Sequence, residues 1–275
     1  MQITSLLPAL SLTLAMTAYA EPPAPYHLDC GTFEVRAYQD AAQEIPGCIF
    51  DRPDGPFRSS CNVFLVIDGD RLTLIDAGNG APRGSLLAQL RADGIDPAAI
   101  TDILLTHEHP DHVGGLFLPD GHPAFPNATL HFFLPPDGRP AFPNATLRFF
   151  LPEGISAPLD FVTRAQTAGY AITTFSDPDN ADLPPGFVPE PARGHTPIHV
   201  FYRKDNILFI GDTFHAVDLQ VPHPEISARW DYDPAAAVQV RRTLLDRIQS
   251  TPSLRVFGAP IPFPGLLERV HFDHS

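Results

Sequence analysis

The sequence predicts an α/β protein with one domain. Short apolar runs of strand composition recur along the chain, helical segments alternate with them, and no low-complexity linker divides the 275 residues. Hydrophobic residues make up 44% of the chain and charged residues 18%, so it can bury one sizeable core. We therefore expect a single domain over residues 21–275, preceded by a separate segment over residues 1–20.

Eight strands and two helices are expected. The apolar runs that predict strands are Phe33–Ala37, Asn62–Ile67, Leu72–Ile75, Ile103–Leu105, Ile172–Phe175, His199–Tyr202, Ile207–Ile210 and Leu254–Phe257. One helix is expected over Gly84–Ala92. A second runs from Asp233 to about Ile248, because Asp is a good N-cap and Pro234 suits the first helical position.

The first twenty residues have the composition of a signal peptide. An apolar stretch over residues 2–20 closes in Ala18-Tyr19-Ala20, a small-x-small cleavage pattern, so we expect cleavage before Glu21 and a periplasmic or secreted protein. The alternative is a buried N-terminal helix, which the prolines after Glu21 disfavour. In an oxidising compartment Cys48 and Cys61 are the expected disulfide pair, with Cys30 left over; three unpaired thiols are the alternative.

A tandem duplication interrupts the alternation of strands and helices. Residues 119–135 recur as 136–152 with two differences, at His122/Arg139 and His131/Arg148. Two copies of this length cannot stack as a solenoid, so one copy should fill a strand position and the other be added at an edge. Both copies contain an Asn-Ala-Thr glycosylation pattern, at Asn127 and Asn144, but a turn that starts a strand is the favoured interpretation.

The net charge argues against two kinds of partner. The chain has 18 Lys and Arg against 32 Asp and Glu, a net charge of −14, and so lacks the basic surface that nucleic acids require. Beyond the N-terminal segment, no apolar run is long enough to span a bilayer. We expect a small-molecule substrate, with neither nucleic acid nor membrane as partner, and the oligomeric state stays open.

The residues best suited to chemistry follow the strand Ile103–Leu105. The segment Thr106-His107-Glu108-His109-Pro110-Asp111-His112 brings three imidazoles and an Asp carboxylate to one strand end, and these are zinc's usual ligands apart from thiolate. The alternative, a solvated loop with incidental histidines, fits this spacing poorly. Two later segments, Gly194-His195-Thr196-Pro197 and Gly211-Asp212-Thr213, adjoin other expected strands; each alone is an ordinary turn signal.

Taken together, these motifs resemble the metallo-β-lactamase-fold hydrolases. Leu74-Ile75-Asp76-Ala77-Gly78 belongs to the same pattern, and residues 258–265 resemble a branch of exported methyl parathion hydrolase and lactonase-like enzymes. The resemblance implies an αββα sandwich with a metal centre at one edge of the two sheets. It also implies Zn²⁺, one or two ions, although other divalent transition metals suit the same ligands.

The resemblance assigns roles to individual residues. His107, His109 and His195 would hold one ion, Asp111 and His112 the other, and Asp212 both. Metal-bound hydroxide would attack an ester, lactone or phosphotriester, with Asp212 orienting it and Asp111 handling the proton. Asp76 would fix a ligand imidazole or serve as a structural turn. His215 is a candidate for substrate binding, since it follows Asp212 closely.

Three departures from the family pattern lie near this site. Pro260 stands where the branch has the last His ligand of the second ion, Ile198 replaces a glycine, and the duplication follows the ligand loop. A non-catalytic or impaired metal-binding or ligand-binding protein of the same fold is therefore the main alternative. A nuclease is disfavoured by charge, and a di-iron redox protein remains open because these ligands do not select one metal.

Overall fold

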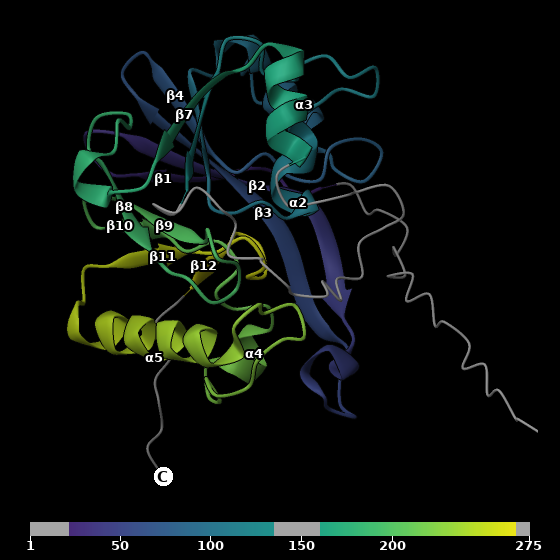
Figure 1. Ribbon diagram of the computed structural model, residues 1–275, viewed down its shortest axis with the longest axis vertical. Coiled ribbons are helices and arrows are strands. Elements are labelled where there is room, and N and C mark those ends of the chain that lie inside the picture. Colours follow the sequence, from purple (N-terminus) through teal and green to yellow (C-terminus); the bar gives the residue numbers. More distant parts are fainter. Residues whose placement is uncertain (1–21, 135–159, 268–275) are drawn as a thin grey trace, which may run out of the picture.

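Two facing β-sheets form the centre of the fold (Figure 1). The computed structural model describes residues 22–134 and 160–267. The seven-stranded sheet has the order β1-β2-β3-β4-β5-β6-β7, and the five-stranded sheet has the order β12-β11-β10-β9-β8. The strands are β1 (Tyr26–Asp29), β2 (Glu34–Ile45), β3 (Phe57–Asp68), β4 (Arg71–Ile75), β5 (Asp102–Leu105), β6 (Thr129–Phe133), β7 (Ala171–Phe175), β8 (Phe187–Pro191), β9 (Val200–Lys204), β10 (Ile207–Phe209), β11 (Arg255–Phe257) and β12 (Leu266–Leu267).

Helices cover the outer faces of both sheets. In Figure 1, α3 lies above the seven-stranded sheet and α5 below the five-stranded sheet. The α-helices are α1 (Leu86–Ala92), α2 (Pro110–Val113), α3 (Asp160–Ala168), α4 (Val217–Gln220) and α5 (Pro234–Ser250). The 3₁₀ helices are η1 (Gly47–Phe50), η2 (Pro97–Ala99), η3 (Gly114–Leu116) and η4 (Pro178–Asn180). This layering confirms the expected α/β sandwich.

Three apolar clusters hold the layers together. The cluster between the sheets contains Phe64 and Leu104 from one sheet and Phe209 and Phe257 from the other. A second cluster lies between the seven-stranded sheet and helices α1 and α3, and a third between the five-stranded sheet and α5. Strand β3 is buried over most of its length, because its alternate side chains enter two of these clusters.

Every predicted strand and helix is present. Among the described residues, the strands β1, β8 and β12, the helices α2, α3 and α4 and the short 3₁₀ helices were not predicted. Strand β8 was missed because Pro189 and Pro191 argue against a central strand, and β8 is an edge strand, where missing N–H donors are tolerated. The paired strands β2 and β3 are also longer than their apolar runs, since they continue as a hairpin past Gln39 and Asn62.

The first copy of the duplication forms strand β6. It pairs in parallel with β5 on one side and with β7 on the other. His131 is buried there, with Nε2 3.0 Å from Asp102 Oδ1 and Nδ1 3.1 Å from the carbonyl of Asp182. Asn127 Nδ2 donates to the carbonyl of Ala98, which fits a turn before the strand. The second copy, residues 136–152 with Asn144, lies outside the described residues.

Deleting one copy at a time tests which sequence suits this strand. Deletion of 136–152 and deletion of 119–135 give chains of equal length that differ at two positions, so each is the matched control of the other. The second deletion brings Arg148 to the position of His131. Because that position is buried, we expect it to lower the free energy of unfolding by about 1–3 kcal/mol relative to the first. Equal stability in chemical denaturation would contradict the role of His131.

The three cysteines are unpaired, so the expected Cys48–Cys61 disulfide is wrong. Cys48 is exposed in η1, whereas Cys61 is buried in β3 with its thiol 3.3 Å from the carbonyl of Asp111. These two thiols do not pair, because Cys48 faces solvent and Cys61 faces the protein interior. The expected signal peptide, residues 1–20, lies outside the described residues. Among the residues described, no helix is long and apolar enough to cross a membrane.

Candidate metal centre

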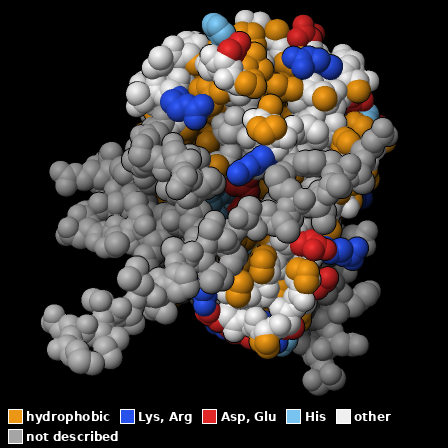
Figure 2. Space-filling model, turned by 90° about the vertical axis from the view of Figure 1, so that its right-hand side faces the viewer, with side chains coloured by type: hydrophobic (Ala, Val, Ile, Leu, Met, Phe, Trp, Pro, Cys, Tyr) orange, Lys and Arg blue, Asp and Glu red, His pale blue; other side chains and the backbone are white. Residues whose placement is uncertain are grey.

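The candidate site lies where strands of both sheets end. The ligand loop follows β5, Asp76 follows β4, Asp212 comes shortly after β10, and His195 precedes β9. The backbone N–H of Val200 donates to the carbonyl of Thr106 at 3.0 Å, which joins the sheets at this edge. Figure 2 shows acidic and histidine side chains recessed near the middle of one face.

The ligand loop turns sharply into the short helix α2. His109 is the N-cap of α2 and Pro110 takes its first position, as proline's fixed φ favours. Backbone N–H groups of His112 and Val113 donate to the carbonyl of His109. All four residues follow strand β5 along the chain. This turn brings His109, Asp111 and His112 close to His107.

The first cluster contains one ligand atom from each of four residues. His107, His109, His195 and Asp212 offer atoms that all lie within 4.8 Å of one another. His195 Nε2 lies 3.0 Å from His109 Nδ1 and 3.8 Å from Asp212 Oδ2. Burial lowers the pKa of all three histidines well below its ordinary value, so their rings are neutral and have a lone pair to offer.

The second cluster shares Asp212 with the first. It contains Asp111, His112 and Asp212, again within 4.8 Å. His112 Nε2 lies 3.0 Å from Asp212 Oδ1 and 3.8 Å from Asp111 Oδ2. Although burial alone would lower the pKa of His112, the carboxylates of Asp212, Asp76 and Asp111 raise it well above its ordinary value. A cation would replace that proton between the same groups.

Buried polar atoms show that these clusters fit a metal ion. His107 Nε2 is buried without a hydrogen-bond partner, which is rare for buried side-chain atoms, and Asp212 Oδ1 is buried with only the ion pair to His112. Burial also raises the pKa of Asp212, an effect partly offset by His112. Imidazole nitrogens and carboxylate oxygens are the donors that zinc and similar divalent ions prefer. The site therefore has both the geometry and the donor chemistry of a divalent metal centre.

Asp76 lies beneath the ligand loop. Its Oδ2 is 2.8 Å from His112 Nδ1, and its Oδ1 accepts from the backbone N–H of Thr106 at 2.8 Å. The residue has a φ of 63°, a conformation that Asp tolerates better than most residues. Asp76 thus combines both roles considered from the sequence, since it contacts a ligand imidazole and shapes a buried turn.

His215 lies beside Asp212 with both ring nitrogens unpartnered. The residue is 2% exposed, and His215 Nε2 is 3.7 Å from Asp212 Oδ2. Its backbone N–H donates to the side chain of Gln220, and its ring lies 5.3 Å from the ring of Trp230. The ring nitrogens therefore remain available to a bound molecule. The neighbouring aromatic residues Phe132 and Phe133 of β6 pack in the core.

The positions that depart from the family pattern have different consequences. Pro260 is buried, and its carbonyl accepts hydrogen bonds from the hydroxyl of Ser59 and from the backbone N–H of Ser60. Its side chain offers no ligand, so the second cluster has three protein ligands. Ile198 is buried between the sheets and is not among the described residues with positive φ. The backbone at this position therefore accepts an isoleucine without strain.

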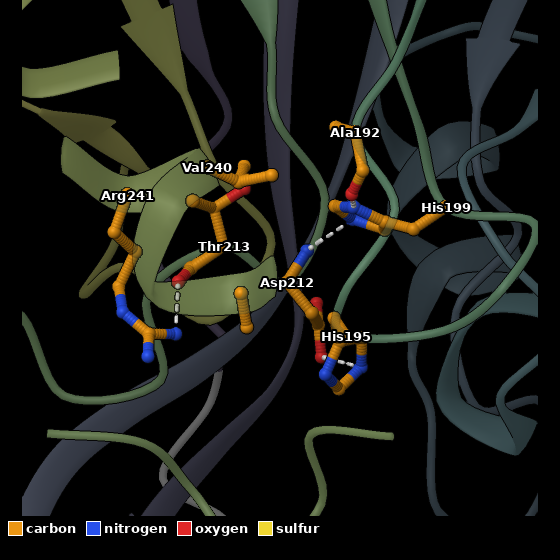
Figure 3. Close-up of a pocket in the computed structure, with 8 residues that line it drawn as sticks. Ala192, His195, His199, Asp212, Thr213, Val240 and Arg241 are labelled. Carbon is orange, nitrogen blue, oxygen red and sulfur yellow. Dashed lines mark hydrogen bonds and ion pairs between the residues drawn. The ribbon is translucent and has the colours of Figure 1, made fainter. Parts of the chain in front are cut away.

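Sequence reasoning missed three residues that contact the site. Glu108 accepts a hydrogen bond from Thr196, and desolvation raises its pKa to about 7. Asp231 contacts His195. His199 Nε2 accepts from the backbone N–H of Asp212 at 3.2 Å, an interaction drawn in Figure 3. His199 had a usable signal, its spacing from His195, whereas nothing in the sequence around Asp231 distinguishes it from a loop carboxylate.

Comparisons with known proteins agree with this architecture. The family model of the Metallo-beta-lactamase superfamily matches residues 56–259. "Metallo-beta-lactamase domain-containing protein 1" of Xenopus laevis is 42% identical over 53 residues, 19% of this chain and 23% of that protein. "Atrochrysone carboxyl ACP thioesterase nsrC" of Aspergillus novofumigatus is 36% identical over 72 residues, 26% and 21% of the two chains. The chain thus aligns with about a fifth of each curated relative.

Solved structures match nearly the whole length. AidC, described as a dizinc quorum-quenching lactonase, has a TM-score of 0.75 at 24% identity, covering 88% of this chain and 92% of its own. The hydrolase AbOPH has a TM-score of 0.66 at 27% identity, covering 90% and 93%. AiiA of B. thuringiensis has a TM-score of 0.58 at 14% identity, covering 85% and 98%.

The protein has four layers, with two sheets between helices, and a buried cluster of His and Asp side chains lies at one edge of the sheets. This combination is typical of a class of metal-dependent hydrolases. The family model covers most of the chain, and the ligand loop and Asp212 lie within the matched residues. This chain belongs to the metallo-β-lactamase superfamily.

Proposed function

We propose that this protein is a zinc-dependent hydrolase that cleaves an ester, lactone or phosphotriester bond in a small molecule. One observation carries the proposal: six side chains from three segments converge at one place, and His107 Nε2 is buried there without a hydrogen-bond partner. A metal-dependent hydrolase needs such a cation-binding place to polarise its substrate. The family, and neighbours described as lactonases and hydrolases, support the same chemistry.

The role that we propose for each residue follows from its position in the site. A bound divalent ion supplies Lewis acidity and lowers the pKa of water at the site. Asp212, which faces both clusters, orients the attacking water between them. Asp111 has a side chain that is 36% exposed, so it passes the proton on to solvent. His215, with both ring nitrogens unpartnered, hydrogen-bonds a substrate oxygen beside Asp212.

An open groove behind the loop of Asp231 has the size of a small-molecule site, and none of the six candidate ligands lines it. Its volume is about 430 Å³, within the range of small-molecule sites, and Asp231 connects it to His195. Its lining mixes apolar and charged side chains, namely Phe50, Asp51, Ile226, Ser227, Ala228, Arg229, Asp231 and Pro234. The net charge of −14 supports a substrate that is not a polyanion.

A panel of substrates tests the proposal. Lactones, aryl esters and phosphotriesters are offered to the zinc-loaded protein, to His109→Ala, and to His223→Ala as a matched control on an exposed loop. We expect turnover of at least one class by the parent and by His223→Ala, and its loss in His109→Ala, which removes a ligand of the first cluster. Equal turnover by parent and His109→Ala would mean that the activity does not belong to this site.

Replacing Pro260 by histidine is expected to strengthen the second ion. The second cluster has three protein ligands, one of them 36% exposed, whereas the first has four. We therefore expect the parent to hold one ion tightly and a second weakly, and Pro260→His to raise the zinc content or the hydrolysis rate. Elemental analysis after dialysis measures the first quantity. No change in either would contradict this account of Pro260, and Pro262→His is the matched control.

A non-catalytic metal-binding protein of the same fold is the second candidate. The observation that favours it is the side chain of Pro260, which leaves the second cluster without the family's last histidine. This candidate predicts zinc binding at the first cluster without hydrolysis of any substrate in the panel. Zinc binding together with turnover that His109→Ala abolishes would exclude it.

We also propose that the protein is exported. The apolar segment 2–20 and its Ala18-Tyr19-Ala20 end support this proposal. Expression of the full chain in a Gram-negative host is expected to release a periplasmic protein whose N-terminus, read by mass spectrometry, is Glu21. A protein retained in the cytoplasm with residues 2–20 intact would contradict it.

A further inference from the structure

Asp231 lies behind the ligand His195, in the loop between α4 and α5. The side chain of Asp231 has no exposed surface, and its Oδ1 is 3.1 Å from His195 Nδ1. The same loop holds the backbone of the ligand, because Tyr232 and Asp233 donate their N–H groups to the carbonyls of His195 and Gly194. One short segment thus fixes His195 through both its ring and its main chain.

The contact with Asp231 decides which ring nitrogen of His195 faces the metal cluster. An ionised carboxylate oxygen only accepts hydrogen bonds, so Nδ1 of the neutral ring carries the proton and donates it. Nε2 then has the lone pair, and it is this atom that lies 3.0 Å from His109 Nδ1 and 3.8 Å from Asp212 Oδ2. Histidine ligands commonly depend on such a carboxylate for their orientation.

Arg241 holds Asp231 in place from helix α5. It is 1% exposed, and its Nη1 is 3.2 Å from Asp231 Oδ2. Its other donors reach carbonyl or hydroxyl oxygens of Pro224, Ser227 and Thr213. Figure 3 shows Arg241 reaching the carbonyl of Thr213, next to Asp212. A planar guanidinium with several fixed donors is suited to this position, and its charge balances the buried carboxylate.

Asp231 is placed to position a ligand rather than to bind metal itself. It lies within 4.8 Å of ring nitrogens of His195 and His215, a grouping that resembles a ligand set. Both of its oxygens are already engaged, however, Oδ1 by His195 and Oδ2 by Arg241 and the backbone N–H of Ala228. The carboxylate has little capacity left for an ion.

We propose that Asp231 and Arg241 form a positioning pair that fixes the tautomer and the ring orientation of His195 for the first metal cluster. Asp76 has the corresponding place at the second cluster, because it contacts Nδ1 of His112. Each cluster thus has one carboxylate that contacts Nδ1 of a ligand histidine, namely Asp231 at the first cluster and Asp76 at the second. The proposal rests on the proposed metal function, but its effect on the tautomer of His195 does not require bound metal.

Two measurements on Asp231→Asn test the pair. The first is the tautomer of His195 in the metal-free protein, read from long-range ¹H–¹⁵N NMR of histidine side chains. The second is the affinity for zinc, measured by competition with a chromogenic chelator. We expect His195 to change from Nδ1–H to a mixture of tautomers, and the first zinc to bind about 10- to 100-fold more weakly. Asp246→Asn, an exposed change on α5, is the matched control and should match the parent.

A second variant covers the case in which Asp231→Asn does not fold. Arg241→Lys keeps the positive charge but loses the planar fork, so we expect it to weaken the first zinc several-fold, whereas Arg242→Lys, at an exposed position, leaves it unchanged. Asp76→Asn should weaken the second ion instead. A folded Asp231→Asn or Arg241→Lys protein with parental affinity for the first zinc and unchanged Nδ1–H on His195 would overturn the proposal. A parent that binds no zinc would instead refute the proposed function, and the tautomer of His195 would still test the pair.

Discussion

Replacing Asp212 by alanine is expected to weaken metal binding at both clusters and to abolish hydrolysis. Asp212 belongs to both ligand sets, with Oδ1 3.0 Å from His112 Nε2 and Oδ2 3.8 Å from His195 Nε2. Loss of this carboxylate leaves the first cluster with three histidines and the second with Asp111 and His112. Metal polarisation is worth several kcal/mol in the transition state, so we expect the rate to fall by roughly a thousandfold or more.

Elemental analysis and steady-state kinetics measure this result, and Asp246→Ala is the matched control. The metal-free Asp212→Ala protein is expected to remain folded, because burial disfavours the charge of this carboxylate in the absence of a cation. A variant that retained zinc at parental stoichiometry, or that hydrolysed substrate at a parental rate, would show that Asp212 is not the shared ligand.

Gly115→Ala is expected to cause the largest loss of stability. A Cβ at Gly115 would lie 1.9 Å from the carbonyl oxygen of Ala77, a backbone atom that cannot move aside alone. Gly115 also donates its N–H to the carbonyl of Gly78, and Ala77 donates to the carbonyl of His112. The ligand loop and the loop after β4 are thus interlocked, and we expect a cost of about 3 kcal/mol in the free energy of unfolding.

Gly121→Ala is the control that separates the steric clash expected at Gly115 from the cost of placing alanine at a positive φ. A Cβ at Gly121 would meet nothing within 4 Å, but its φ is +86°, so we expect a smaller cost of about 1–2 kcal/mol. Denaturant unfolding of both variants measures the difference, and zinc content is expected to fall in Gly115→Ala alone. If Gly115→Ala were as stable as Gly121→Ala, the packing of the ligand loop against Ala77 would be less tight than the structure indicates.

The sequence predicted the layers and the ligand loop for different physical reasons. Apolar runs such as Leu72–Ile75 and Ile207–Ile210 mark strands buried on both faces, and the Asp233-Pro234 pair marks the start of α5, as the structure confirms. The ligand spacing from His107 to His112 is local, so it was visible without a fold. How the three ligand segments meet was supplied by a family resemblance, since no local pattern states which strands end side by side.

What the sequence did not predict depends on long-range contacts. Asp231 contacts His195, and Arg241 contacts Asp231, although the two residues are ten positions apart. They meet in one buried network because α5 packs against the five-stranded sheet. The wrong disulfide pairing arose from the same limitation. Closeness in sequence suggested Cys48 and Cys61, but β3 carries Cys61 into the interior while η1 leaves Cys48 at the surface. Strand β8 was hidden by its prolines.

The most direct test of the metal centre is a count of zinc ions bound per chain. The purified protein is stripped with chelator, reconstituted with zinc, dialysed and subjected to elemental analysis. The four ligands of the first cluster and the three of the second predict at least one tightly held ion per chain, and a second that is lost on prolonged dialysis. Less than half an equivalent of zinc after reconstitution would contradict the account.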